Sequence, residues 1–459
     1  MTLSRRTFLG AAAAATAASG TSLLSVCAAE TPSAVPLPAL IGNRFLTFNT
    51  VIRVNQVEAG RKQDIGVDES AIHTPAAVQA LRDAFGRGWP GGRMTWAFSW
   101  RALQDQRGNY QAIRDLVRSF HKRYGDEITF FAGGYFANMY NTREQVNRDL
   151  HDALAMVSAM VGGGYRPRSV LAGYLAAENQ RYLAEQEGIH VCQGNIWSQY
   201  AVDFGDGDGS ICYPYYPSRE HFCKPAQGKG DFIDCVNLDG WTIDFLSARR
   251  TGLTAEYNSR MGVGPIETVY RLGEEVGVRE MLATTAAHFD RGFALNGFAW
   301  VTDCWEVCLH EMGGFSGLSR WLSEVRRRWP RALCVTQGEF GMAWREHFRS
   351  NAAINYRFVA RGSGIHGSEE NLEIRWFMNQ DFRLALLRDW KADGPELVID
   401  FTRYDLPAAE PQGKGRNWSL MNRINQKQTR PQDKPIPLAQ LTAAEQALIR
   451  RRYGELLGG

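Results

Sequence analysis

Eight short apolar runs, separated by segments of helical periodicity, constrain the fold of this chain more than any other feature. Each run is rich in Val, Ile, Phe, Thr or Trp and is apolar on both faces, as strands inside a parallel sheet are. The predicted strands are residues 45–54, 94–100, 128–135, 169–175, 189–196, 232–238, 293–301 and 333–336. Because strands that alternate with helices form βαβ units, the pattern predicts an α/β fold, a TIM-like (β/α)7–8 barrel.

Two of the intervening helices begin with clear capping signals. Thr74 directly precedes Pro75, the usual order of an N-cap residue and the first helical residue. Thr142 and Gln145 have the spacing of a capping box. These signals predict helices that start at residues 75 and 143.

The pattern changes along the chain in a way that predicts five parts. Residues 1–28 are a signal peptide, 29–38 a linker, and 39–348 the catalytic barrel. Short strands and Gly-rich turns then predict a small β-rich appendage over residues 349–405. Residues 406–459 are predicted to form a surface loop and a terminal helix.

The N-terminus predicts export. Ser4-Arg5-Arg6-Thr7-Phe8-Leu9 resembles a twin-arginine signal and is followed by an Ala-rich apolar run. We therefore expect a periplasmic or secreted protein, folded before export. No later run approaches the length of a membrane span, so no integral membrane segment is expected in the mature protein. The formal charge of +3, about +1 without the signal, gives no electrostatic basis for binding nucleic acid or an anionic membrane.

A long loop within residues 189–249 is dense in Asp, Tyr, Trp, Gly, Pro and Cys. A loop of this length in a compact domain is usually functional, and its aromatic content argues against disorder. Cys212 and Cys223 could staple it. Its Asp-Gly run, residues 203–209, leaves three interpretations open: a structural calcium site, tight turns, or direct substrate contact.

Acidic and aromatic residues follow most of the predicted strands, at the end of a barrel where ligands bind. Aromatic faces stack on sugar rings, and two carboxylates can supply the acid and the base or nucleophile that cleave a glycosidic bond. A single Asp at a strand end can instead cap the next helix. The candidate catalytic residues are Asp303, Glu339, Glu178, Asp239 and Glu306. The candidate substrate-binding residues are Trp96, Trp100, Tyr135, Asn138, Trp197, Gln199, Asp203, Asp206, Asp208, Trp241, Asp244, Trp300, Trp305 and Arg345.

Several motifs resemble the glycoside hydrolase/deacetylase superfamily, whose barrels are similar to those of polysaccharide deacetylases. Asp68-Glu69, Thr74-Pro75 and residues 94–98 resemble its opening acidic motif, helix and second strand; residues 148–167 and 183–188 resemble its later helix, Arg-Pro strand entry and Gly-Ile segment. The whole chain also resembles a bacterial family of exported proteins.

The resemblance has consequences for metal binding and for the catalytic pair. Deacetylases of the superfamily hold a metal ion with one Asp and two His on the third unit, but residues 135–141 contain no His. Metal-free glycosidases of the family 57 type use a Glu after the fourth strand and an Asp after the seventh. By strand count these are Glu178 and Asp303.

The sequence thus predicts an exported glycoside hydrolase acting on an oligo- or polysaccharide, with Asp303 as the first choice of acid and no cofactor. Two alternatives stay open. One is a metal-dependent deacetylase or esterase that uses His221, His310 and the loop aspartates. The other is a non-catalytic glycan-binding protein.

Overall fold

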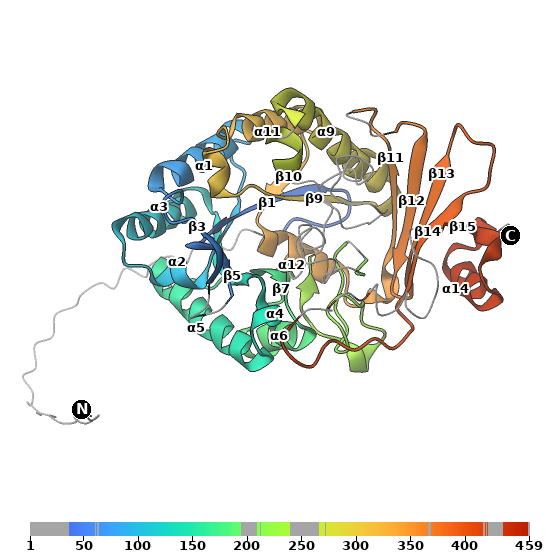
Figure 1. Ribbon diagram of the computed structural model, residues 1–459, viewed down its shortest axis with the longest axis horizontal. Coiled ribbons are helices and arrows are strands. Elements are labelled where there is room, and N and C mark those ends of the chain that lie inside the picture. The colour runs from blue at the N-terminus through green and yellow to red at the C-terminus, as the bar shows by residue number, and fades with distance from the viewer. Residues whose placement is uncertain are drawn as a thin grey trace, which may run out of the picture. The chain divides into compact units, whose positions relative to one another are not determined.

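A curled parallel sheet forms the centre of the larger part of the chain in the computed structural model (Figure 1). The structure describes residues 36–59, 61, 64–193, 209–211, 213–238, 266–270, 272–365, 369–415, 418, 420 and 435–457. Leu37–Gly459 forms one compact unit, distinct from Met1–Pro36.

Strand β1 (Arg44–Ile52) pairs with β9 along one edge and with β10 and β4 along the other, since Asn49 has a partner on both β9 and β4. The sheet continues through β5 and β6 to β7 and β8, all parallel. The further strands are β4 (Thr95–Phe98), β5 (Glu127–Phe136), β6 (Val170–Tyr174), β7 (Val191–Gln193), β8 (Val236–Asn237), β9 (Ala299–Cys304) and β10 (Leu333–Val335). Each predicted run overlaps one of these eight strands. The described residues form a half-barrel, in which β8 and β9 are not seen to pair.

The predicted helix starts are confirmed. Thr74 accepts a hydrogen bond from the Ala77 N–H and caps α1, and Thr142 and Gln145 form the capping box of α5. The helices are α1 (Pro75–Gly88), α2 (Trp100–Gln104), α3 (Gly108–Tyr124), α4 (Ala137–Tyr140), α5 (Arg143–Val161), α6 (Ala177–Tyr182), α9 (Glu274–Ala286), α10 (Phe293–Asn296), α11 (Ser316–Arg328), α12 (Gln337–His347) and α14 (Ala443–Tyr453). Shorter turns of helix are η1 (Leu183–Glu187), η2 (Lys229–Asp231), η3 (Ile266–Tyr270), η4 (Ala287–Gly292), η5 (Val307–His310), η6 (Asn351–Ala353), η7 (Leu438–Gln440) and η8 (Gly454–Leu457).

The two faces of the sheet have different partners. Phe48 contacts Phe85 of α1, and Trp96 contacts Phe120 of α3, so these side chains lie on the outer, helix-covered face. Because side chains alternate along a strand, Phe45 of β1 lies on the inner face. There its ring meets Phe340 of α12 at 5.2 Å. Helix α12 therefore packs against the concave face of the sheet.

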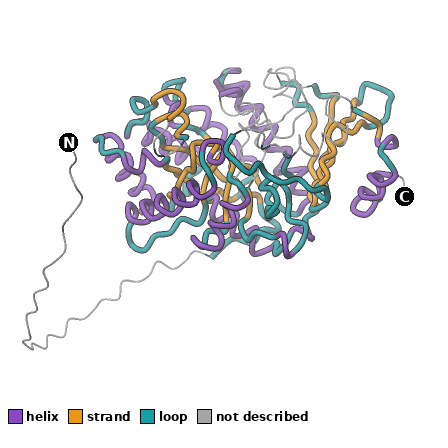
Figure 2. Tube along the Cα trace, turned by 60° about the horizontal axis from the view of Figure 1, so that its bottom comes forward, coloured by secondary structure: helices purple, strands orange, loops and turns teal. Residues whose placement is uncertain are grey.

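A second sheet follows the half-barrel and packs against it. Its antiparallel strands are β11 (Asn355–Arg361), β12 (Leu372–Asn379), β13 (Phe382–Asp389), β14 (Leu397–Arg403) and β15 (Ile436–Pro437). Strands β11 to β14 lie within residues 349–405, which were predicted to be β-rich, whereas β15 lies in the segment predicted to form a surface loop and a terminal helix. One face contributes Tyr356 and Trp376 to the main core, while the other packs Phe382 and Phe401 in a cluster with Ile449 and Tyr453 of α14. In Figure 2 the strands of this sheet lie between the half-barrel and the C-terminal helix.

Two features of the chain were not predicted. A hairpin of β2 (Asn55–Glu58) and β3 (Asp64–Asp68) connects β1 to α1. The predicted surface loop after residue 405 is wrong in part, because Glu410 and Trp418 are buried. The Glu410 carboxylate accepts hydrogen bonds from the Ala177 and Phe222 N–H groups, so this segment joins separate loops of the half-barrel.

The packing of α12 can be tested with two helical glycines. A Cβ at Gly341 would overlap the side chain of Val191 on β7, whereas at Gly86 of α1 the nearest atom is Arg82 Nη1 at 3.4 Å. Helix propensity favours Ala over Gly by about 1 kcal/mol at either position. We expect Gly86→Ala to raise the free energy of unfolding and Gly341→Ala to lower it by about 1–3 kcal/mol, the usual cost of overpacking. Urea unfolding of both variants measures this, and equal stabilisation would contradict the interior position of α12.

Candidate functional site

A buried arginine at the C-terminal end of β1 binds two glutamates from distant parts of the chain. Arg53 Nε and Nη2 lie 2.6 and 2.9 Å from the two carboxylate oxygens of Glu69. Its Nη2 and Nη1 lie 2.7 and 3.3 Å from the two oxygens of Glu306. Together with His73, whose Nε2 is 3.2 Å from Glu69, these residues form what we call the Arg53 cluster.

Local structure brings each member to this place. Glu69 follows the hairpin β2–β3, and its N–H donates to the Val54 carbonyl at 2.7 Å. His73 lies one residue before the N-cap of α1. Glu306 follows β9 and is the N-cap residue of η5. The Tyr110 hydroxyl of α3 donates to the Arg53 carbonyl at 2.8 Å and fixes the backbone where β1 ends.

The two carboxylates of the cluster differ in their surroundings. Burial would raise the pKa of Glu69, but the hydrogen bonds from His73 and Arg53 outweigh it and lower the pKa to about 2. Glu69 is therefore an anion at neutral pH and cannot act as a general acid. The side chain of Glu306 is 23% exposed against 9% for Glu69, so Glu306 is the carboxylate that a ligand can reach.

Neutral polar groups line the concave face of the sheet on the same side as Arg53. Asn49 Nδ2 donates to Gln193 Oε1 at 3.1 Å, and the Gln337 side chain donates to the same oxygen. The Gln337 N–H donates to Thr95 Oγ1 at 3.1 Å. These buried amides connect β1, β4, β7 and the first turn of α12.

The prediction of Asp303 as the catalytic acid requires correction. Asp303 pairs in register with Phe48, whose side chain lies on the outer face, so its carboxylate points toward the helices rather than toward the concave side. There it accepts hydrogen bonds from the Trp305 indole and the Cys304 N–H, both at 2.9 Å. Burial raises its pKa to about 7, against the effect of these two hydrogen bonds.

Glu339 lies near the end of the sheet opposite to the one predicted to be catalytic. It forms a capping box with Thr336 at the start of α12. The same carboxylate binds Arg93 Nε at 3.0 Å, and Arg93 lies just before β4. Glu339 is therefore near the N-terminal end of the strands, where it caps a helix and pairs with an arginine.

The position of Glu178 fits the structural interpretation better than the catalytic one. It lies in the first turn of α6, where a carboxylate is favoured by the helix dipole. Its side chain is 47% exposed and lies 3.8 Å from Arg143 Nε. It makes no described contact with the Arg53 cluster.

Most of the described aromatic candidates belong to the core. Trp96, Trp300 and Trp305 are fully buried, and their indole N–H groups donate to Asp126, Thr47 and Asp303. Only Trp100 is partly exposed, and the Arg61 guanidinium lies 3.9 Å from its ring centroid. Of the described Trp candidates, Trp100 alone keeps an accessible surface for a sugar.

Two polar candidates hold the scaffold together. Asn138 accepts a hydrogen bond from the Ala176 N–H and donates to Asn179, both within 2.8 Å, and so connects the ends of β5 and β6. Arg345 of α12 binds Asp234 at 2.8 Å, just before β8, which is the N-terminal end of that strand. Neither side chain is directed at the Arg53 cluster.

The remaining candidates lie outside the described residues and stay predictions. These are Asp239, Trp197, Gln199, Asp203, Asp206, Asp208, Trp241, Asp244 and the side chain of Tyr135. The possible calcium site and the possible staple between Cys212 and Cys223 also include residues outside the described ranges. The described cysteines Cys192, Cys235, Cys304, Cys308 and Cys334 are thiols.

The ligand set suggested for a metal-dependent esterase is not assembled in the described part of the chain. Both ring nitrogens of His221 are engaged, since Nε2 lies 3.0 Å from the Trp418 carbonyl and Nδ1 accepts from the Cys223 N–H. Within the described ranges, no group of three or more His, Cys, Asp or Glu side chains could hold a metal ion. The same ranges contain no helix with the length and hydropathy needed to cross a membrane.

Comparison with known proteins identifies the family. The profile of the family "Domain of Unknown Function with solved-structure structure (DUF3863)" matches residues 38–378, and that of DUF3864 matches residues 383–456. The first match covers most of the chain, which therefore belongs to the DUF3863 family. No protein with a curated description matches it.

A solved structure from Parabacteroides distasonis, provisionally described as a glycoside hydrolase/deacetylase, shares 51% sequence identity with this chain. The match covers 92% of this chain and 100% of that one, with a TM-score of 0.85. A provisionally named polysaccharide deacetylase from Pseudomonas aeruginosa PAO1 shares 13% identity over 66% of this chain and 91% of its own, with a TM-score of 0.43. The predicted membership of the glycoside hydrolase/deacetylase superfamily is confirmed by the first of these.

The buried position of Asp303 predicts a distinct pH dependence of stability. Its folded pKa of about 7 lies above the ordinary aspartate value of 3.8, so ionising it costs folding energy as the pH rises between these values. Asp303→Asn removes this pH-dependent cost, which is at most about 4 kcal/mol, although its NH2 group replaces one of the two acceptor oxygens. We expect the variant to gain stability relative to the wild type between pH 5 and pH 8 in urea unfolding. Asp115→Asn, at an exposed site on α3, should show no such gain; if Asp303→Asn behaves the same way, the carboxylate is not buried as described.

Proposed function

We propose that this protein is an exported carbohydrate-active hydrolase, a glycoside hydrolase, whose reaction takes place beside the Arg53 cluster. The observation that carries the proposal is the convergence of Glu306 and Glu69 on one buried guanidinium at the C-terminal ends of β1 and β9. That end of a parallel α/β barrel is where catalytic side chains lie. The relative from Parabacteroides distasonis supports the enzyme class.

In this proposal Glu306 acts as the general base or nucleophile. A carboxylate that accepts two hydrogen bonds from a guanidinium is favoured in its ionised form, which suits either role. Arg53 also fixes the orientation of the carboxylate, and Glu69 keeps Arg53 in place. The proton donor to the leaving group would be a second carboxyl group. In place of Asp303 we propose Asp239, another of the predicted catalytic candidates, which lies two residues beyond β8 in the sequence.

Substitution of Glu306 tests this assignment. We expect Glu306→Gln to lower kcat by about 10²–10⁴-fold, the usual contribution of a positioned acid–base group, with a smaller change in KM. The assay is release of reducing ends from a panel of polysaccharides, with acetate release measured in parallel to detect a deacetylase. Glu324→Gln, on the exposed side of α11 next to Arg327, is the matched control and should keep full activity.

Thermal unfolding of both variants excludes loss of the fold as the cause, since Arg53 retains Glu69 when Glu306 is replaced. Full activity of Glu306→Gln on a substrate that the wild type cleaves would contradict the assignment. Release of acetate without reducing ends would replace the glycosidase by an esterase.

We further propose that residues 1–28 direct twin-arginine export to the periplasm. The double substitution Arg5→Lys and Arg6→Lys should abolish periplasmic accumulation, measured by cell fractionation and immunoblotting, while Ser4→Ala should not. Unchanged export of the double variant would contradict the pathway.

A further inference from the structure

An exposed tryptophan is held at the tip of the hairpin β13–β14. Trp390 begins the turn of residues 390–396 and is 48% exposed, the one aromatic ring among the exposed large apolar side chains of the described residues. The backbone N–H of Trp390 donates to the Asn371 carbonyl at 2.8 Å. Next to it, the Asp389 carboxylate accepts from Asn371 Nδ2 at 2.7 Å and from the Lys391 N–H at 2.9 Å. The ring is therefore presented by an ordered turn.

Two arginines lie next to the Trp390 ring. The guanidinium carbon of Arg388 lies 3.8 Å from the ring centroid, and that of Arg361 lies 6.0 Å from it. In the described part of the chain neither guanidinium has a carboxylate partner, although Arg375 on the same sheet pairs with Glu396 at 2.8 Å. Arg361 Nε donates to the Glu370 carbonyl at 2.7 Å, and the Arg388 guanidinium stacks on the indole ring. Both residues are exposed, so their remaining N–H groups can reach a ligand.

The arginines lie on the face of the second sheet that packs against α14. Phe377 and Leu384 pack in the cluster around α14, and alternation along β12 and β13 places Arg388 on the same face. Arg361 lies on this face too, because its strand-register partner is Glu373, whose own register partner on β13 is Arg388. The face is covered near α14 and open at the hairpin tip.

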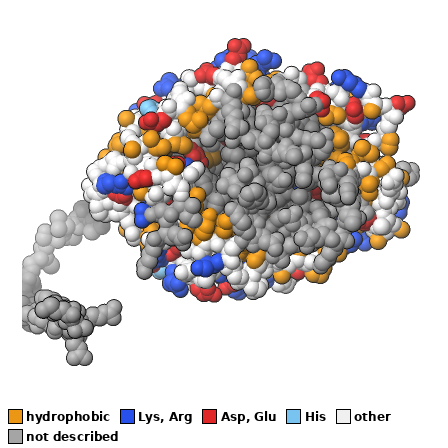
Figure 3. All heavy atoms as spheres, in the orientation of Figure 1, with side chains coloured by type: hydrophobic (Ala, Val, Ile, Leu, Met, Phe, Trp, Pro, Cys, Tyr) orange, Lys and Arg blue, Asp and Glu red, His pale blue; other side chains and the backbone are white. Residues whose placement is uncertain are grey.

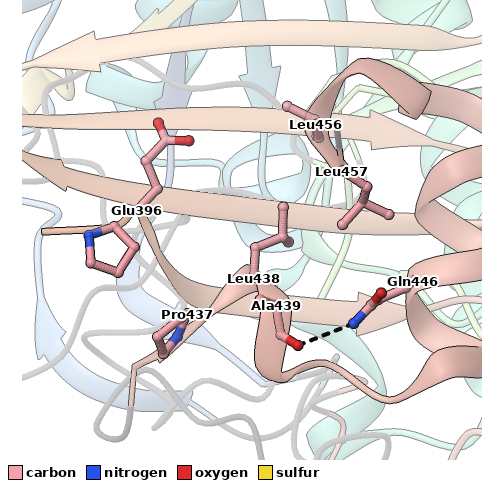
Figure 4. Close-up of a pocket in the computed structure, with 8 residues that line it drawn as sticks. Glu396, Pro437, Leu438, Ala439, Gln446, Leu456 and Leu457 are labelled. Atoms are coloured by element: carbon pink, nitrogen blue, oxygen red, sulfur yellow. Dashed lines mark hydrogen bonds between the residues drawn. The ribbon is translucent and has the colours of Figure 1, made fainter. Parts of the chain in front are cut away.

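A groove of about 400 Å³ lies on this face, between the same hairpin and the C-terminal helices (Figure 4). Leu438, Leu456 and Leu457 face the groove, and Glu396 and Gln446 lie on opposite sides of it. The groove has a lining that is polar and apolar in about equal measure. Its volume suits one or two sugar units.

We propose that Trp390, Arg388 and Arg361 form a second polysaccharide-binding site, specific for acidic glycans, with the groove as its extension. This site rests on the proposed function, whose substrate class it narrows to polysaccharides that carry carboxylate or sulfate groups. The part of the indole that the Arg388 guanidinium leaves exposed attracts the C–H bonds of a sugar ring. The two guanidinium groups bind the acidic substituents through charge-assisted hydrogen bonds.

Charge distribution favours a glycan over other polyanions. Binding of nucleic acid or an anionic membrane depends on broad positive potential, but the net charge of this chain is only +3. On the face shown in Figure 3 the described acidic and basic side chains are interspersed. A small site with one aromatic ring and two cations suits an acidic glycan, whose sugar rings can stack on the tryptophan and carry isolated charges.

Binding of the full chain to polygalacturonate, measured by affinity electrophoresis at two salt concentrations, tests the site. We expect Trp390→Ala and the double variant Arg361→Ala/Arg388→Ala each to weaken binding by about tenfold, the effect of losing one aromatic or cation contact that is desolvated in the complex. Leu295→Ala, at another exposed apolar position, is the control and should bind as the wild type does. Dextran, a neutral polymer, should bind weakly to all of them.

Equal binding of polygalacturonate by the wild type, by Trp390→Ala and by the double arginine variant would overturn the proposal. So would preferential binding of duplex DNA or phosphatidylserine vesicles that is lost in the same variants. The Glu306→Gln variant should bind polygalacturonate normally, and Trp390→Ala should cleave a short soluble substrate normally. A failure of the catalytic proposal is thereby distinguishable from a failure of this one.

Discussion

The need to compensate one buried charge organises the C-terminal end of the half-barrel. Arg53 is 3% exposed, and removing one partner from a buried ion pair typically costs about 3–5 kcal/mol. Glu69 and Glu306 meet this need from positions 16 and 253 residues away. The hairpin β2–β3, the start of α1 and the turn after β9 are consequently held together at one point. The same interaction leaves one carboxylate accessible and the other fixed as an anion.

The opposite end of the sheet is stabilised by buried ion pairs and hydrogen bonds. Arg82 binds Asp126 with both side chains buried, and Glu127 accepts hydrogen bonds from Ser169 and from the Gly338 N–H. Helix α12 begins there and fills the concave face with Phe340. This division agrees with the general behaviour of parallel barrels, in which one end supplies stability and the other function. It also explains why Glu339, which lies four residues after the end of β10, is a capping residue.

The strands and caps were predictable because each depends on neighbours in sequence. The eight apolar runs, and Thr74 and Thr142 as capping residues, required no knowledge of distant contacts. The orientation of Asp303 was not predictable, because a shift of one residue along a strand moves a side chain to the other face of a sheet. Arg53 was missed as well, since an arginine at a strand end shows its role only when its partners are known. The opening acidic motif did contain Glu69, but nothing in the sequence connected it with Glu306.

The second sheet is fixed to the half-barrel, and this attachment matters for the binding of a long polymer. Tyr356 and Trp376 on one of its faces belong to the same hydrophobic core as β1 and α12, so the sheet cannot move independently without exposing that core. The buried Glu410, which binds Arg143 and two backbone N–H groups of the half-barrel, ties the following segment down too. A polymer held at the tip of the hairpin β13–β14 stays at a fixed distance from the Arg53 cluster. Its local concentration at the cluster then depends on polymer length rather than on domain motion, which is the geometric condition for two weak sites to bind one long chain tightly.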